Sequence, residues 1–220
     1  MITIQPTGGL CNYLRTIFSY YEYTRKNNLE LNIIWIKTSH CPGYFLDYFE
    51  PIPHVSFKEN VDKDVKIDYK GGVPMKNFKP KYDKLKLKSH LEKIVFDKLD
   101  ILNKNYISVH IRRTDHTALA KKNNSYTNDE EFIDFLDKSD NNKNIYIATD
   151  NEITYNKFKE KYQNRIKFDY HKTNKSTQRK TSLQDAIIDI YMCVYSDDFK
   201  GSGWSSFSGL IQNLRIQGCK

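Results

Sequence analysis

The chain has 220 residues and a mass of 26.0 kDa, enough for one large domain or two small ones that bury a core without disulfide bonds. Hydrophobic residues make up 39% of the chain and aromatic residues 14%, which excludes a disordered protein. The net charge of +8 is typical of proteins with a polyanionic partner, whether nucleic acid, a phosphorylated small molecule or an acidic membrane, although a biased genome would explain most of the lysines by itself.

The cysteines and the N-terminus indicate where the protein works. The four cysteines form no CxxC pair and no His/Cys metal spacing, so we expect thiols in a reducing compartment. The opening sequence MITIQPTGG lacks the charged and apolar regions of a signal peptide, and no apolar run has the length of a membrane span. We therefore expect a soluble cytoplasmic protein without a membrane partner.

Glycines interrupt the chain between its first predicted strand and its first predicted helix. The predicted elements of the first half are a strand over 2–5, a helix over 10–25, a strand over 31–36, a short helix over 44–50 and a helix over 91–102. The opening is thus a βαβ unit with a glycine turn at 8–9. Residues 57–90 are rich in Lys and Asp and show little periodicity, which predicts a linker or a mobile insert.

Strands and helices also alternate in the second half. Strands are predicted over 106–111, 144–150, 165–170 and 198–201, helices over 129–138, 152–162, 182–195 and 210–216, and a basic polar loop over 171–181. This alternation predicts an α/β protein with two Rossmann-like units and parallel sheets, in which the N-terminal unit is reduced. The expected domains are 1–95 and 96–220.

Charged and polar residues follow several predicted strands directly. In open parallel sheets ligands bind beyond the carboxyl ends of the strands. Gly8 and Gly9 follow the first strand, residues 112–115 follow YISVHI, Thr149 and Asp150 follow IYIA, and residues 201–208 follow the last strand. This convergence predicts a ligand site at the strand ends.

The segment HIRRTDH offers the strongest binding chemistry. Arg binds phosphate oxygens in a bidentate manner, and a strand end fixes its position. The alternative is that Arg112 and Arg113 pair with nearby acids such as Asp115 and Asp150. His110 faces either the core or the site. Asp115 and His116 are candidate proton acceptors.

Three further stretches have the chemistry of nucleotide binding. GSGWSSFSG opens a helix whose N–H groups are able to bind phosphate, although a Ser cap with turn glycines is an ordinary alternative. PTGGLCN is a glycine turn before a helix but not a GxGxxG motif. Asp185 and Asp189 lie one turn apart, and a carboxylate there is able to accept both N–H donors of a guanine edge. A partly solvated helix flank fits Asp185 better than Asp189.

Four segments in this order resemble the GT-B fucosyltransferases of the α1,2-, α1,6- and protein O-fucosyltransferase superfamily. They are GGLCNYLRTIFSYYEYTRKNN, VHIRRTDH, IYIATDN and SLQDAIIDIYMCVYSDDFKGSGWSSFSGLI, and HxRRTD is the most specific. The resemblance covers about residues 3–36 and 104–217. It implies a GT-B-like, inverting and metal-independent enzyme without a cofactor that moves fucose from GDP-fucose to a glycan hydroxyl, with an acceptor-side unit over 1–95 and a GDP-sugar-binding unit over 96–220.

The resemblance also implies roles for individual residues. Arg112 would hold the β-phosphate of GDP, and His110 and Asp189 would recognise the nucleoside. The remaining donor-binding positions are Gly9, Asn12, Asp150, Ser205 and Ser206. The proposed catalytic residues are Arg112, Asp115 and His116.

The sequence departs from the family pattern in two respects. It is shorter than most relatives, and residues 117–120 contain no Glu where α1,6-type relatives have one, so the resemblance does not identify a catalytic base. The alternatives are a transferase that uses another GDP-sugar, a degenerate transferase that binds nucleotide without chemistry, and a basic nucleic-acid-binding protein. The last is disfavoured because the basic residues form no single stripe and match no nucleic-acid-binding motif.

Overall fold

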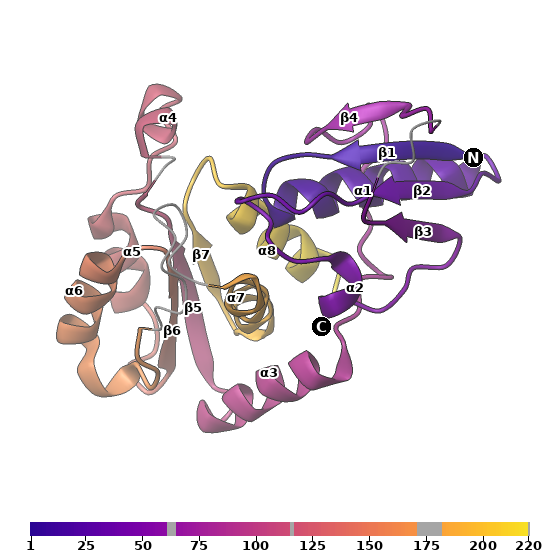
Figure 1. Ribbon diagram of the computed structural model, residues 1–220. Helices are drawn as coiled ribbons and strands as arrows, with labels where there is room; N and C mark the ends of the chain where they lie inside the picture. Colours follow the sequence, from indigo (N-terminus) through magenta and orange to yellow (C-terminus); the bar gives the residue numbers. More distant parts are fainter. Residues whose placement is uncertain (61–64, 115–116, 171–181, 220) are drawn as a thin grey trace. The chain divides into compact units, whose positions relative to one another are not determined.

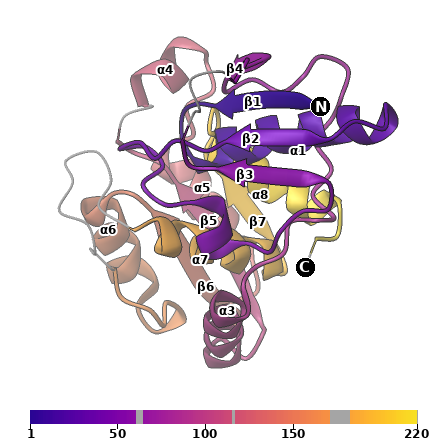
Figure 2. The ribbon, with the colours of Figure 1, turned by 45° about the vertical axis from the view of Figure 1, so that its right-hand side comes forward.

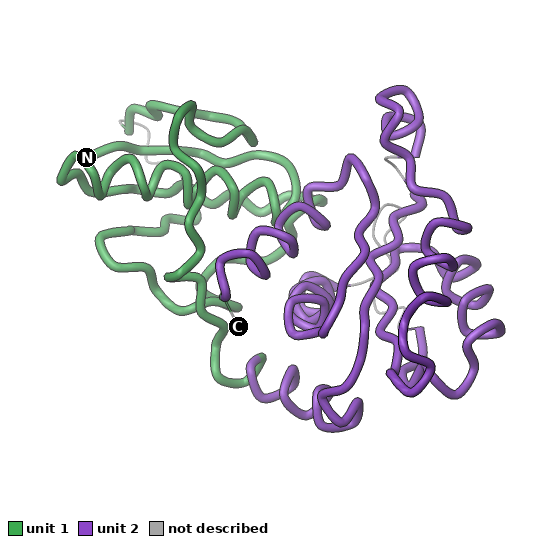
Figure 3. The backbone as a smooth tube through the Cα atoms, turned by 180° about the vertical axis from the view of Figure 1, so that it is seen from behind, with its two compact units in different colours: residues 1–91, 219 green, residues 92–218, 220 purple. Residues whose placement is uncertain are grey.

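The chain consists of two compact units. The computed structural model describes residues 1–60, 65–114, 117–170 and 182–219. Unit 1 comprises residues 1–91 together with Cys219, and unit 2 comprises residues 92–218 (Figure 3). Each unit contains one parallel sheet, of four and three strands, so the predicted pair of α/β units with parallel sheets is confirmed.

Unit 1 is built on the βαβ opening. Strand β1 (Ile2–Pro6) leads into helix α1 (Leu10–Lys26) and then into strand β2 (Leu31–Ile34), which pairs with β1. One face of α1 is apolar, with Leu14, Ile17 and Phe18 nearly inaccessible to solvent, and this face packs on β1 and β2. Helix α2 (Phe45–Tyr48) is one turn long, so unit 1 is reduced in helices.

The prediction that residues 57–90 form a linker or a mobile insert is wrong where two strands of the sheet lie. Strand β3 (Val55–Lys58) pairs with β2, and strand β4 (Tyr69–Gly71) pairs with β1, which gives the sheet order β3-β2-β1-β4 (Figure 2). Both are short strands at the edges of the sheet, and their outer side chains face solvent. Backbone pairing holds both strands, and Phe57 of β3 and Tyr69 of β4 add ring contacts with Phe45 and Tyr20. Strands this short and half-exposed show no clear hydrophobic pattern.

Unit 2 places helices on both faces of a sheet of order β6-β5-β7. Its elements are α3 (Ser89–Ile101, which begins in unit 1), β5 (Tyr106–Ile111), α4 (Thr117–Lys122), α5 (Asp129–Asp137), β6 (Asn144–Thr149), α6 (Glu152–Tyr162), η1 (Gln163–Arg165), α7 (Leu183–Tyr195), β7 (Phe199–Gly201) and α8 (Ser206–Ile216). Helices α5 and α6 cover one face of the sheet, and α7 covers the other (Figure 1).

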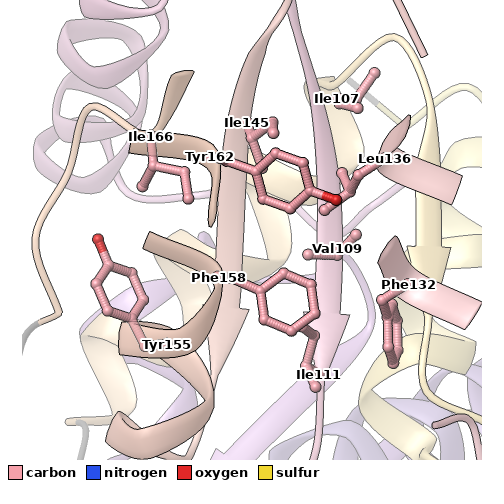
Figure 4. Close-up of a cluster of buried hydrophobic side chains, with 10 residues drawn as sticks. All are labelled: Ile107, Val109, Ile111, Phe132, Leu136, Ile145, Tyr155, Phe158, Tyr162 and Ile166. Atoms are coloured by element: carbon pink, nitrogen blue, oxygen red, sulfur yellow. The ribbon is translucent and has the colours of Figure 1, made fainter. Parts of the chain in front are cut away.

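The two faces of β5 differ in chemistry. Ile107, Val109 and Ile111 point into an apolar cluster with side chains of α5 and α6 (Figure 4). The intervening residues Tyr106, Ser108 and His110 are also buried but form hydrogen bonds, to Met192, Ser196 and Ser208 respectively. A strand that is buried on both sides thus uses one face for packing and the other for polar contacts with the α7 and α8 region.

Two further predictions in unit 2 need correction. Residues 165–170 form no strand. Side chains occupy their backbone carbonyls instead, because Lys159 donates to Ile166 O and the Tyr155 hydroxyl donates to Phe168 O. The last helix begins at Ser206 rather than at 210, since the small polar residues of its first turn belong to the helix.

Candidate active site

The carboxyl ends of β5, β6 and β7 meet at one edge of the unit 2 sheet. The Arg112 N–H donates to Ser202 Oγ at 2.9 Å, which connects the end of β5 to the residue after β7. The Arg113 N–H donates to Asp150 Oδ1 at 2.9 Å, which connects the end of β5 to the residue after β6. The predicted convergence of Arg112 and Asp150 is therefore present, and Ser202 belongs to the same edge.

Arg113 is a structural residue of this edge. Its side chain is 10% exposed, and its guanidinium donates to Asp129 Oδ1 at 2.6 Å and lies near the rings of Tyr126 and Phe132. Burial raises the pKa of Asp129, but hydrogen bonds from Lys157 and Arg113 outweigh burial and hold the pKa below its usual value. The alternative that the arginines pair with nearby acidic side chains is therefore correct for Arg113, whose partner is Asp129.

His110 is a buried, neutral residue directly below the strand end. Its ring stacks on Phe207 at 4.4 Å, and Nδ1 lies 2.7 Å from Ser208 Oγ. Burial, followed by the positive charge of Arg112, lowers the pKa of His110 to about 3. The imidazole therefore stays uncharged at neutral pH and serves as a hydrogen-bonding group rather than as a proton acceptor.

The N-terminus of α8 lies at the same strand ends. Ser205 is the N-cap, and its hydroxyl accepts the Ser208 N–H at 3.4 Å, while Ser206 is the exposed first residue of the helix. Gly201 lets α8 approach β7, because a side chain there would come within 2.6 Å of Ser208 Oγ. The serine pair thus has the predicted place at a helix N-terminus, with the cap as one of its roles.

Asp189 lines a cavity of about 70 Å³ between α7 and the edge strand β6. Its carboxylate accepts a 2.6 Å hydrogen bond from the hydroxyl of Tyr146. Burial raises the pKa of Asp189 to about 7; Asp185 contributes to the rise, and the Tyr146 hydroxyl and Lys98 oppose it. Asp185 instead completes the N-terminal capping box of α7 with Ser182. Both carboxylates line the cavity, but Asp185 is engaged by the helix cap, whereas Asp189 lies beside Tyr146 of the sheet.

Gly9 and Asn12 lie in unit 1, at the turn between β1 and α1. Gly8, with φ +94°, takes the left-handed conformation that the turn requires, and Gly9 is the N-cap of α1. Asn12 Oδ1 accepts a 3.2 Å hydrogen bond from Arg15, which also donates to Gly72 O at 3.1 Å. Arg15, which was not among the predicted site residues, thereby orients the amide of Asn12.

Sequence reasoning also missed Asp129, and it selected Ser202 only as a member of residues 201–208, because the roles of both depend on distant parts of the chain. Two predicted catalytic residues, Asp115 and His116, lie outside the described residues. In the part of the chain that is described, no three His, Cys, Asp or Glu side chains gather closely enough to hold a metal ion. None of the described helices is both long and apolar enough to span a membrane.

Comparisons with family models and with curated sequences give one match between them. A family model described as GDP-fucose protein O-fucosyltransferase matches residues 22–216. No curated protein sequence gives a significant match.

Several solved structures share the fold. NodZ α-1,6-fucosyltransferase co-crystallised with GDP is 13% identical, with a TM-score of 0.64 over 96% of this chain and 91% of that chain. The same enzyme soaked with GDP-fucose is 12% identical, with a TM-score of 0.65 over 97% and 92%. Fucosyltransferase NodZ from Bradyrhizobium is 12% identical, with a TM-score of 0.62 over 96% and 92%. The predicted GT-B-like α/β architecture is thus confirmed.

Proposed function

The chain belongs to the GDP-fucose protein O-fucosyltransferase family and is a glycosyltransferase, and from this premise we propose that it is an inverting, metal-independent enzyme that moves fucose from GDP-fucose to a glycan hydroxyl. The observation that carries the proposal is the edge where Arg112, Asp150 and the N-terminus of α8 follow three parallel strands. Such an edge is the usual ligand site of an open α/β sheet. The NodZ structures with GDP and GDP-fucose support the choice of donor.

The proposed reaction is a single displacement. The oxygen of an acceptor hydroxyl attacks C1 of fucose, the bond from C1 to the β-phosphate oxygen breaks, and its electron pair stays on GDP. Negative charge therefore grows on the β-phosphate in the transition state. A fixed Arg112 guanidinium and the positive end of α8 at Ser205 and Ser206 stabilise that charge more than they stabilise the ground state, which is the condition for catalysis.

The nucleoside is proposed to bind on the α7 side of the sheet. Neutral His110 offers its remaining ring nitrogen to the nucleoside, and the Asp189 carboxylate accepts the two N–H groups of a guanine edge. Tyr146 orients that carboxylate through its hydroxyl. A base without this pair of donors leaves the buried carboxylate with fewer hydrogen bonds than guanine provides, so guanine is favoured over adenine or uracil.

The remaining roles follow the family pattern. Asp150 fixes the backbone of Arg113 and thereby the strand end that carries Arg112. Unit 1 is proposed as the acceptor-side unit, and Gly9 and Asn12 are proposed as donor-binding residues. The proton of the acceptor hydroxyl passes to Asp115 or His116, and because GDP is a good leaving group, a weak base is sufficient.

A nucleotide panel tests the donor. GDP and GDP-fucose are expected to raise the melting temperature in the presence of EDTA, whereas ADP and UDP at the same concentration leave it unchanged. A larger shift with GDP-mannose than with GDP-fucose would favour the alternative that another GDP-sugar is used. Equal shifts with all three nucleoside diphosphates would contradict the guanine assignment.

Substitution of Arg112 tests the chemistry. We expect Arg112→Ala to lower kcat for fucose transfer or GDP-fucose hydrolysis at least about 100-fold while the protein stays folded, because the charge on the leaving diphosphate loses its guanidinium. Arg112→Lys is the matched control and should recover part of the rate through its positive charge alone. Near-normal turnover by Arg112→Ala would remove Arg112 from the mechanism.

A further inference from the structure

Trp204 is exposed beside the proposed diphosphate site. It is one of two tryptophans in the chain and directly precedes the serine pair at the start of α8. Its side chain is 54% exposed, whereas the other tryptophan, Trp35, is 1% exposed. Large aromatic side chains are usually buried unless they meet a partner.

Hydrogen bonds from the two residues that precede Trp204 fix the backbone of its loop. The Ser202 N–H donates to His110 O at 2.9 Å, and the Gly203 N–H donates to Thr127 Oγ1 at 2.9 Å. Gly203 also lies so close to Ser125 that a side chain there would overlap the Ser125 carbonyl oxygen. The exposed indole is therefore attached to a backbone whose position is fixed by hydrogen bonds.

The backbone of Trp204 is strained. Its φ of +53° lies in the left-handed region, which is unfavourable for a bulky side chain and suits Gly or Asn. With more than half of its surface exposed, the indole contributes less to packing than the buried indole of Trp35 does. A residue that destabilises the loop while facing solvent is best explained by a contact that forms with a ligand.

Resting on the proposed function, we propose that the face of Trp204 stacks on the pyranose ring of the sugar that is transferred. The sugar is bonded to the β-phosphate, and Trp204 is adjacent in sequence to the helix start proposed to bind that phosphate. The electron-rich face of an indole attracts the weakly positive C–H groups of a sugar ring. Trp204 is thus assigned as a specificity residue that distinguishes GDP-fucose from GDP.

Binding of the two nucleotides to three proteins tests this assignment. We expect the wild type to bind GDP-fucose about tenfold more tightly than GDP, Trp204→Asn to bind the two equally, and the aromatic variant Trp204→Phe to keep most of the preference. GDP itself should bind Trp204→Asn as it binds the wild type. Because Asn tolerates the left-handed conformation, the melting temperature of Trp204→Asn should stay the same or rise by about 2 °C.

Intrinsic fluorescence provides a second readout. GDP-fucose, but not GDP, should change the emission of the wild type and of Trp35→Phe, and the change should be absent in Trp204→Phe. A retained preference for GDP-fucose in Trp204→Asn, or a marked loss of its thermal stability, overturns the assignment and leaves the proposed function intact. Failure of the wild type to bind either nucleotide overturns the proposed function and this inference together.

Discussion

Arg112 and Arg113 are neighbours in sequence but differ in their surroundings. The guanidinium of Arg113 pairs with Asp129 between two aromatic rings, while Arg112 is fixed at the strand end by its backbone N–H. Adjacent residues of an extended chain point in opposite directions, so the side chain of Arg112 does not share the surroundings of Arg113. A sequence motif does not distinguish the two arginines, although their surroundings in the fold differ.

This difference gives a paired prediction. Arg113→Ala should lower the free energy of unfolding by about 2–3 kcal/mol, because it leaves the carboxylate of Asp129 with Lys157 as its remaining ionic partner. Arg112→Ala should lose more activity for each unit of stability lost, because the proposed contact with the diphosphate belongs to Arg112. Urea denaturation and kcat, measured on both variants, check the prediction. The same ratio of stability loss to activity loss in the two variants would contradict it.

Asp189 is a residue at which stability and function are expected to conflict. Burial raises its pKa to about 7 in the folded protein. Below about pH 4 the carboxyl is protonated in both the folded and the unfolded state, so it does not lower the free energy of unfolding. As the pH rises through 7 the buried carboxyl must ionise, and the folded protein loses stability relative to the unfolded chain.

Asp189→Asn should therefore raise the free energy of unfolding of the ligand-free protein by about 1–3 kcal/mol at pH 8 and by nothing near pH 4. The same variant should lose its preference for GDP over ADP, since an amide cannot accept both guanine N–H groups. Urea denaturation at both pH values and nucleotide titrations give the two readouts. A variant that is less stable at pH 8 would contradict the burial argument.

At the scale of elements, β4 shows how a polar segment becomes part of a sheet. Asp68 precedes the strand and accepts the Thr3 N–H at 2.9 Å on its carboxylate, while its own N–H donates to Thr3 O at 2.8 Å. These bonds set the register in which β4 pairs with β1. The end of the strand then brings Gly72 to Arg15 and so to Asn12.

Asp68→Ala should lower the stability of unit 1 by about 1 kcal/mol, because the Thr3 N–H loses its acceptor. Asp68→Asn is the matched control that keeps an acceptor oxygen, and substitution of the exposed Lys70 by Ala should have no effect. Amide hydrogen exchange at Thr3 measures the local effect and thermal denaturation the global one. Unchanged exchange at Thr3 in Asp68→Ala would mean that β4 does not depend on this contact.

For the whole molecule, the buried groups His110 and Asp189 have opposite pH effects. The pKa of His110 is lowered to about 3, so its contribution to stability is present above pH 6.5 and is lost as the pH falls toward 3. The contribution of Asp189 is lost as the pH rises toward 7. Binding of guanine to the ionised Asp189 therefore competes with protonation of the same carboxyl.

GDP affinity should consequently rise about tenfold between pH 6 and pH 8, because most of the Asp189 carboxyl is protonated at pH 6. Isothermal titration at both pH values measures this change. The Asp189→Asn variant, titrated in the same buffers, corrects for ionisation of the GDP phosphate itself. An equal pH dependence in wild type and variant would show that Asp189 does not bind the base.

The sequence alone determined the elements with a strong pattern and the order of the motifs. YISVHI, NIYIAT and the helix from Leu183 could be read directly, because apolar periodicity reports burial, and the charged residues after these strands had to gather at one edge of a parallel sheet. The family and the GT-B architecture followed from the same segments.

Only the tertiary structure decided the features that depend on contacts between residues far apart in sequence. The strands β3 and β4 pair with the backbone of other strands, and in residues 165–170 the carbonyls of Ile166 and Phe168 accept hydrogen bonds from side chains instead of from a strand. The pairing of Arg113 with Asp129 and the outward position of Trp204 depend on contacts made at least 16 residues away. A local pattern does not record such contacts, since folding creates them from parts of the chain that are independent in sequence.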